Sequence, residues 1–286
     1  MTHDSRTTSR GLSMILATFV MFGVVFGVVG SGGAVGSVGV DSFGVVDSST
    51  GLWYLRDAGS GETTSFYFGD PGDVPMMGDW DCDGVDTPGL YRQADGYVYL
   101  SNVNAQGVAD VKFFFGDPGD VPLAGDFDGD GCDTVSVYRP SESRVFVINE
   151  LGGDDGGLGA AELSYLFGNP GDKAFVGDFD GDGVDTVGLH RESTGLVYYT
   201  NSHVQGNAEV EFIYGDPGDK IVTGKWTDAH TVDTVGLFRP STGTMYLKHV
   251  NAAGNADQTH VYGNTNMLPI AGNFGTLPGG DEPPPG

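Results

Sequence analysis

The pentapeptide Gly-Asp-Pro-Gly-Asp occurs at residues 69–73, 116–120 and 215–219, and residues 168–172 repeat it with one change, Asn169. A decayed copy begins at Gly263-Asn264, so successive copies start 47 to 52 residues apart. Proline at the second position of a turn, followed by glycine where φ must be positive, predicts a type II turn in each copy. A fixed period of this kind indicates a repeat architecture.

Each unit between two copies predicts four short strands. An apolar segment ending in Gly-Asp, such as residues 121–126, leads into an Asp-rich loop at residues 126–131. An alternating segment at residues 133–139, a second strand-like run and an aromatic-rich segment then complete the unit. Four-stranded units with a period of about 40–50 residues are typical of β-propeller blades. A β-solenoid usually has a shorter period, and a sandwich has no reason to repeat one loop.

The order of the predicted strands tests whether such a ring would close. The chain begins with the second to fourth strands of a unit, near Val40, and ends with a lone first strand at residues 268–274. We therefore predict an all-β protein: a β-propeller of five four-stranded blades, closed when the C-terminal first strand joins the N-terminal strands. Closure leaves no open blade. A sixth blade supplied by another chain and an open array are the alternatives.

The ends of the chain differ from the repeats. Arg6 and Arg10 precede an apolar run at residues 12–29, and small residues follow. This layout predicts that residues 1–37 are a secretory signal peptide or a retained signal anchor, the run being close to the roughly 17–25 residues of a membrane span. Residues 38–275 form the predicted propeller, located outside the cytosol. The Pro/Gly-rich residues 276–286 are predicted to be a disordered tail.

The charge excludes one class of partner and suggests another. The chain has 39 acidic and 13 basic residues and a net charge of −26, which argues against nucleic-acid binding because phosphate contacts need Lys and Arg. Aspartate supplies 31 of the acidic residues, whereas a salt-adapted acidic surface would use both acids. Aspartate favours turns and ligates hard cations.

Three loops carry aspartate at alternating positions followed by glycine. Alternate spacing lets three carboxylates converge on one centre while glycine permits the sharp turn, and Ca²⁺ suits such oxygen ligands better than Mg²⁺. A further aspartate follows three residues after each triplet. The predicted Ca²⁺ ligands are Asp79, Asp81, Asp83 and Asp86; Asp126, Asp128, Asp130 and Asp133; and Asp178, Asp180, Asp182 and Asp185. The other two loops, which begin at Lys225 and Asn273, have lost ligands and are predicted to be metal-free.

The unit resembles the FG-GAP/VCBS repeats of the integrin α-subunit propeller and of many bacterial surface proteins. The resemblance covers about residues 38–274, and it rests on the Asp loops and on two recurring dipeptides. These are Phe68-Gly69, Phe115-Gly116 and Phe167-Gly168, with Gly78-Asp79, Gly125-Asp126 and Gly177-Asp178. It implies a propeller with Ca²⁺ bound by the first three aspartates of each loop. In the family the last carboxylate usually follows the third aspartate by four residues, and the ring usually has seven blades.

Two cysteines and four arginines lie in or close to these loops in the sequence. Cys82 and Cys132 lie in neighbouring Asp loops, and they can form a disulfide only if their Cα atoms lie within about 7 Å, which the sequence leaves open. An arginine ends the second strand of four units, where it can pair with a nearby aspartate. These arginines are Arg92, Arg139, Arg191 and Arg239.

The family resemblance implies an extracellular binding or adhesion module stabilised by calcium, with a protein or glycan ligand. The alternative is a lectin-like propeller, for which Trp53, Trp80 and Trp226 are the candidate sugar-stacking residues. A glycoside hydrolase needs a single pair of carboxylates in a central cleft, whereas the inner acids here recur in every blade. We therefore expect a binding protein and no enzyme. The membrane would be contacted only through an uncleaved N-terminal segment.

Overall fold

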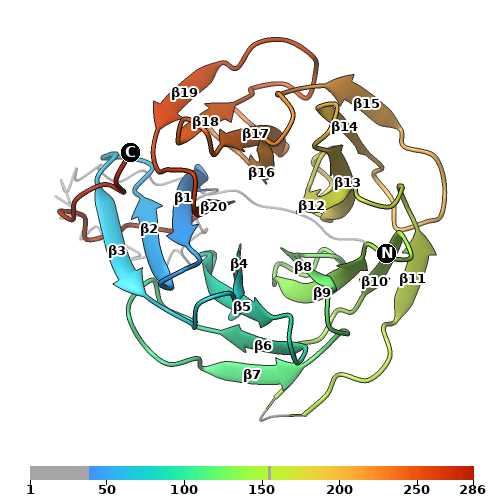
Figure 1. Cartoon of the computed structure of the whole chain (residues 1–286). Coiled ribbons are helices and arrows are strands. Elements are labelled where there is room, and N and C mark those ends of the chain that lie inside the picture. Colours follow the sequence, from blue (N-terminus) through green and yellow to red (C-terminus); the bar gives the residue numbers. More distant parts are fainter. Residues whose placement is uncertain (1–38, 154–155) are drawn as a thin grey trace, which may run out of the picture. The chain divides into compact units, whose positions relative to one another are not determined.

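The computed structural model describes residues 39–153 and 156–286, which form a ring of five four-stranded antiparallel sheets (Figure 1). The predicted five-bladed β-propeller is confirmed. The first blade contains β20 (Met267–Gly272), β1 (Ser42–Asp47), β2 (Leu52–Arg56) and β3 (Thr63–Tyr67), in that order. The predicted signal segment at residues 1–37 lies outside the described residues. Within the described part of the chain, no helix is long and apolar enough to cross a membrane.

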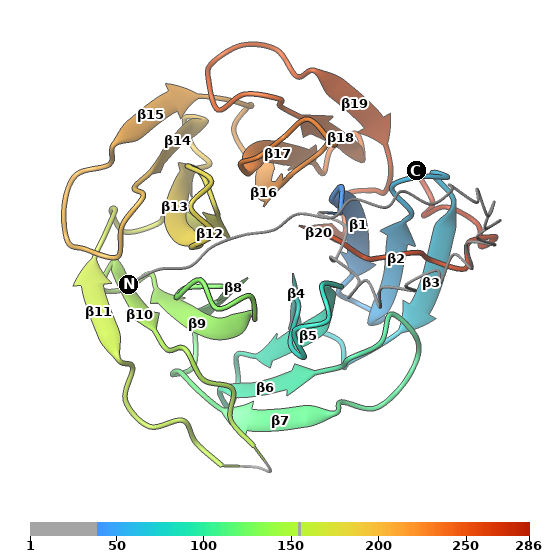
Figure 2. The same cartoon turned by 180° about the vertical axis from the view of Figure 1, so that it is seen from behind.

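The other four blades each use four consecutive strands. The second has β4 (Val74–Gly78), β5 (Thr87–Arg92), β6 (Tyr97–Leu100) and β7 (Val111–Phe114); the third has β8 (Val121–Gly125), β9 (Thr134–Arg139), β10 (Arg144–Val147) and β11 (Leu163–Leu166). The fourth has β12 (Lys173–Gly177), β13 (Thr186–Arg191), β14 (Leu196–Tyr199) and β15 (Val210–Ile213). The fifth has β16 (Lys220–Gly224), β17 (Thr234–Arg239), β18 (Thr244–Leu247) and β19 (Gln258–Val261). The first strand of every blade lies nearest the centre of the ring, and the fourth lies at the rim (Figures 1 and 2).

The ring closes through the two ends of the propeller sequence. β20 pairs antiparallel with β1 along its whole length, from Ser42 opposite Gly272 to Asp47 opposite Met267. The C-terminal strand therefore completes the first blade as predicted. This pairing joins residues more than 200 positions apart. The ring therefore closes only when the last strand of the chain reaches the first.

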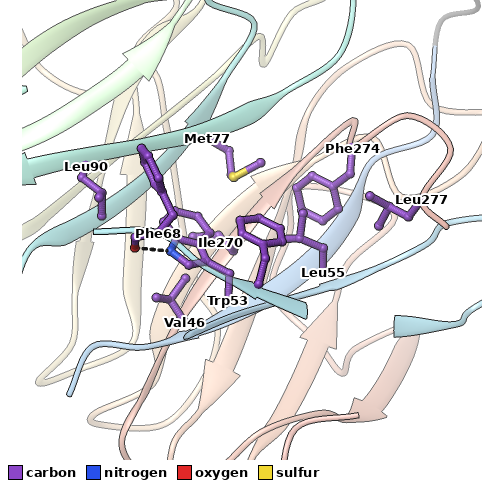
Figure 3. Close-up of a cluster of buried hydrophobic side chains, with 10 residues drawn as sticks. Val46, Trp53, Leu55, Phe68, Met77, Leu90, Ile270, Phe274 and Leu277 are labelled. Carbon is purple, nitrogen blue, oxygen red and sulfur yellow. Dashed lines mark hydrogen bonds between the residues drawn. The ribbon is translucent and has the colours of Figure 1, made fainter. Parts of the chain in front are cut away.

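The core lies mainly between neighbouring blades, as alternating side chains of one sheet pack against the next. At the junction of the first and second blades, Trp53 and Ile270 contact Met77 and Leu90 (Figure 3). The Trp53 indole N–H donates to the carbonyl of Phe68 at 2.9 Å, so its one polar atom is satisfied. Aromatic residues on the rim strands alternate in the same way: Phe113 is fully buried, whereas Phe114 is 39 % exposed.

The repeated pentapeptide forms the predicted turn, and its last aspartate binds an arginine of the same blade in four of the five blades. In its first copy Gly72 has a φ of 91°, and the Asp73 N–H donates to the Asp70 carbonyl at 3.1 Å. The Asp73 carboxylate then accepts two hydrogen bonds from the Arg92 guanidinium. This confirms that the repeated arginines pair with aspartates. The equivalent pairs are Arg139 with Asp120, Arg191 with Asp172, and Arg239 with Asp219.

The C-terminal tail differs from the predicted disordered segment. Leu277 is buried in the core cluster of the first blade, and its N–H donates to Asp57. The Asp281 N–H donates to the carbonyl of Thr63 at 3.0 Å, and its carboxylate accepts from the Ser65 N–H. The free edge of β3 offers unpaired backbone groups that the sequence pattern does not reveal, and the tail satisfies some of them.

Candidate metal centre and the axial aspartate ring

The three Asp-rich loops each bring three carboxylates together. One oxygen from each of Asp79, Asp81 and Asp83 lies within 4.8 Å of the others. The same holds for the triplets Asp126, Asp128, Asp130 and Asp178, Asp180, Asp182. In each triplet the second and third side chains are exposed to solvent, while the first is more buried. Each loop can therefore hold a metal ion at the surface of the ring.

The first aspartate of each loop shapes the curl that makes the carboxylates converge. The Oδ1 atom of Asp126 accepts hydrogen bonds from the N–H groups of Gly129 and Asp130, and its Oδ2 atom accepts from Gly131. Gly129 and Gly131 have φ values of 77° and 88°, a conformation that glycine adopts at little cost. The local sequence thus bends the chain around Asp126.

Converging carboxylates repel one another, and this repulsion contributes to a raised pKa in the first loop. Burial, followed by the charges of Asp83 and Asp79, raises the pKa of Asp81 above its usual value. A bound cation would reverse this effect, because its positive charge favours the ionised form of each ligand.

The structure does not bring the fourth aspartates into these triplets. Asp133, predicted to complete the second loop, instead points to the first loop, where its Oδ2 atom accepts the Asp79 N–H at 2.9 Å. The Asp133 N–H donates in turn to the Asp79 carbonyl at 2.9 Å. Asp185 makes the same two contacts with Asp126. Asp86 makes them with Asn273. We therefore assign these three residues to the junctions between blades.

The same pair of hydrogen bonds, which we call the axial clasp, joins neighbouring blades at all five junctions. Asp233 binds Asp178 in this way, and Asp41 binds Lys225. We call the five residues Asp41, Asp86, Asp133, Asp185 and Asp233 the axial aspartate ring. Asp41 and Asp233 were not among the residues predicted from the sequence. One feature of the sequence could have revealed them. Aspartate stands just before the second strand of every blade, even in the two blades whose loops have lost their metal ligands, so metal binding alone does not explain it.

The axial aspartate ring places several carboxylates close together in a partly desolvated site. Burial, and then the charge of Asp233, raises the pKa of Asp41 to about 7. Burial is also the main cause that raises the pKa of Asp133 to about 7. Lys225 lines the same cavity of about 240 Å³ as Asp86, Asp133 and Asp185. Its ammonium group supplies positive charge to the ring, and the surrounding carboxylates raise its own pKa despite partial burial.

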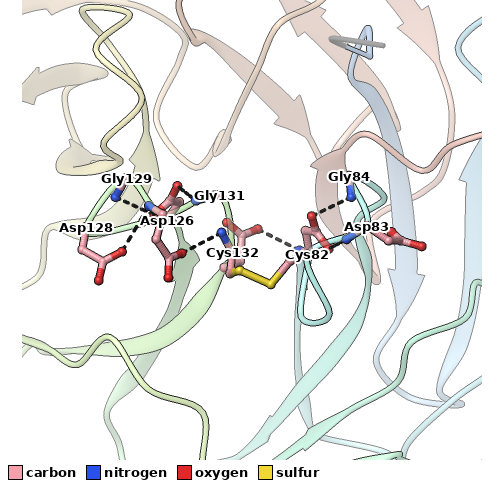
Figure 4. Close-up of a disulfide and its surroundings, with 11 residues drawn as sticks. Cys82, Asp83, Gly84, Asp126, Asp128, Gly129, Gly131 and Cys132 are labelled. Atoms are coloured by element: carbon pink, nitrogen blue, oxygen red, sulfur yellow. Dashed lines mark hydrogen bonds between the residues drawn. A yellow bond between two sulfur atoms is a disulfide. The ribbon is translucent and has the colours of Figure 1, made fainter. Parts of the chain in front are cut away.

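Two of the loops are joined covalently. Cys82 and Cys132 form a disulfide with their Cα atoms 4.7 Å apart, which settles the question that the sequence leaves open (Figure 4). Cys82 lies between Asp81 and Asp83, and Cys132 follows Gly131. The bond therefore connects the first metal loop directly to the second.

The candidate sugar-stacking residues are not available to a ligand. Trp53 is fully buried, and Trp80 and Trp226 are each 5 % exposed. All three rings belong to hydrophobic clusters of the core. An indole must present a free face to stack on a sugar, so the tryptophans that suggested a lectin act in packing.

Comparison with known protein families finds no matching family model. A search of curated proteins also finds no match. The resemblance to FG-GAP/VCBS repeats therefore rests on the loop and turn residues of this chain.

Proposed function

We propose that the protein is an extracellular binding module of the FG-GAP type whose blades are stabilised by Ca²⁺ at three loops. The observation that carries this proposal is the convergence of three carboxylates in each of the three loops. Ca²⁺ accepts about 6–8 oxygen ligands in flexible geometry, and exposed aspartates leave room for water to complete its shell. The partner is a protein or glycan bound on the propeller surface, and no catalysis is proposed.

Two further features support this assignment. A disulfide is typical of proteins that mature outside the reducing cytosol. The inner acids are either loop residues or members of the axial aspartate ring, and each recurs from blade to blade. A catalytic pair of carboxylates would instead occur once, in one cleft.

We expect calorimetry to find three bound Ca²⁺ per chain, and two after Asp128→Ala. The substitution removes one of the three converging carboxylates of the second loop and leaves its fold-determining Asp126 in place. Each occupied site should stabilise the fold by about 2.7 kcal/mol when Ca²⁺ is at 100 times its Kd. A chelator should therefore lower the melting temperature, and Ca²⁺ should restore it more effectively than Mg²⁺.

Asp228→Ala provides the matched control. Asp228 is an exposed aspartate in the loop of the fifth blade, which begins at Lys225 and has lost the alternating pattern. This variant should still bind three Ca²⁺. The proposal fails if the wild-type chain binds no Ca²⁺, or if the two variants have the same stoichiometry.

A further inference from the structure

The two cysteines occupy positions where the other loops have a glycine and a valine. The residue after the second aspartate is Gly129 in the second loop and Gly181 in the third. Their φ values are 77° and 82°. Cys82 holds this position in the first loop with a φ of 64°. A residue with a Cβ atom is strained in this left-handed region. The first metal loop therefore contains a strained residue between two of its candidate ligands.

Equivalent positions of neighbouring loops contact each other around the ring. A Cβ atom added at Gly129 would lie 3.1 Å from Cγ2 of Val184, and one at Gly181 would lie 3.3 Å from Cγ1 of Val232. The Cys82–Cys132 bond is the covalent form of this contact. Replacing the two cysteines by glycine and valine would therefore reproduce a pairing that the chain already uses elsewhere.

The bond also touches the candidate ligands on both sides. Cys82 is covalently flanked by Asp81 and Asp83, so its backbone conformation sets the direction of both carboxylates. On the other side, the Cys132 N–H donates to Oδ1 of Asp130 at 2.9 Å (Figure 4). Val85 and Val184 make the same hydrogen bond in the other two loops, so this contact does not need the disulfide. Breaking the bond would, however, let Cys82 leave the left-handed region.

We propose that the Cys82–Cys132 disulfide is a redox switch that holds the first loop in its metal-binding shape. The inference rests on the proposed metal function and adds a regulation to it. The second and third loops lie outside the switch, because glycine already occupies the left-handed position in each of them, at Gly129 and Gly181. Reduction should weaken metal binding at the first site and leave the other two unchanged.

The chemistry needs a reductant of the dithiol class. One thiolate of the dithiol attacks a sulfur of the bond and forms a mixed disulfide; its second thiolate then displaces the other protein sulfur. The products are two cysteine thiols and an oxidised, cyclic dithiol, so electrons and protons balance. Cys82 is exposed and Cys132 is half-buried, which leaves the bond accessible to such a reagent.

The test is a calorimetric titration of the whole chain with Ca²⁺, with and without dithiothreitol. Releasing Cys82 from the left-handed region removes the restraint on the first loop, so we expect one of the three sites to bind about tenfold more weakly after reduction. In an Asp81→Ala background, which lacks the first site, neither remaining site should respond. Circular dichroism checks that the reduced chain stays folded.

The matched control is the double variant Cys82→Gly, Cys132→Val. It should bind three Ca²⁺ with the affinity of the oxidised protein and ignore dithiothreitol, because glycine adopts the left-handed conformation without a covalent restraint. Equal affinities for the oxidised and reduced wild-type chain would overturn the switch while leaving the metal function intact. Absence of Ca²⁺ binding in the oxidised chain would overturn both proposals.

Discussion

Removing residues 267–286 is expected to prevent the chain from forming a stable ring. The deletion takes away β20, and with it all six residue pairs that complete the first blade. It also removes Ile270 and Leu277 from the core, and Asn273, which clasps Asp86 of the second blade. The exposed inner edge of β1 would offer unpaired backbone groups to other chains. We expect aggregation or a loss of cooperative unfolding, measured by size-exclusion chromatography and thermal circular dichroism.

A shorter deletion, of residues 282–286, separates closure from mere loss of chain length. It keeps β20, the axial clasp and the contact of Asp281 with β3. This variant should stay monodisperse and melt within a few degrees of the wild-type protein. If the longer deletion melted like the wild type, closure by β20 would be refuted.

Lys225→Met is expected to give the second largest loss of stability. It removes the positive charge that lines the cavity with Asp86, Asp133 and Asp185. Removing the partner of a buried charge costs about 3–5 kcal/mol. Because Lys225 is only half-buried and its charge acts on several carboxylates, we expect about 2 kcal/mol at pH 8. For a ring of this size that corresponds to a fall of roughly 4–8 °C in melting temperature. The measurement should be made with chelator, so that only protein charges contribute.

The loss of stability in Lys225→Met should depend on pH. The pKa of Asp41 is raised to about 7 from a usual value of 3.8, so the folded state holds a proton that the unfolded state has already released. Stability from this group is therefore lost as the pH rises from about 4 to 7, and the full penalty remains above pH 7. Lys225 lowers the pKa of Asp41, so losing it should extend the decline to higher pH. The gap between variant and wild type should widen from pH 5 to pH 8.

Lys220→Met is the control for this variant. Lys220 starts the same strand, β16, but its side chain does not line the axial cavity. Its substitution should shift the melting temperature little, and by a similar amount at both pH values. Equal pH profiles for the two variants would show that Lys225 is not the counter-charge of the axial aspartate ring.

The architecture could be predicted because its determinants are local and repeated. Turn chemistry at Asp70-Pro71-Gly72-Asp73 and strand alternation depend on neighbouring residues, so each copy indicates the same element. Counting the copies then predicts five blades and leaves one C-terminal strand for the first. The aspartate triplets are local in the same sense, since alternate spacing in a tight loop brings Asp126, Asp128 and Asp130 together wherever the loop lies.

Most of the roles decided by tertiary structure depend on how neighbouring blades meet. Asp133 follows the second loop in sequence, yet it binds Asp79 of the first, because adjacent blades meet at the axis. The distance between Cys82 and Cys132 and the burial of Trp53 depend on the same packing. The sequence alone determines the repeated unit, the number of blades and the three carboxylate loops, because these arise within one unit. The tertiary structure decides the clasps, the disulfide and the docked tail, because each joins residues that only the closed ring brings into contact.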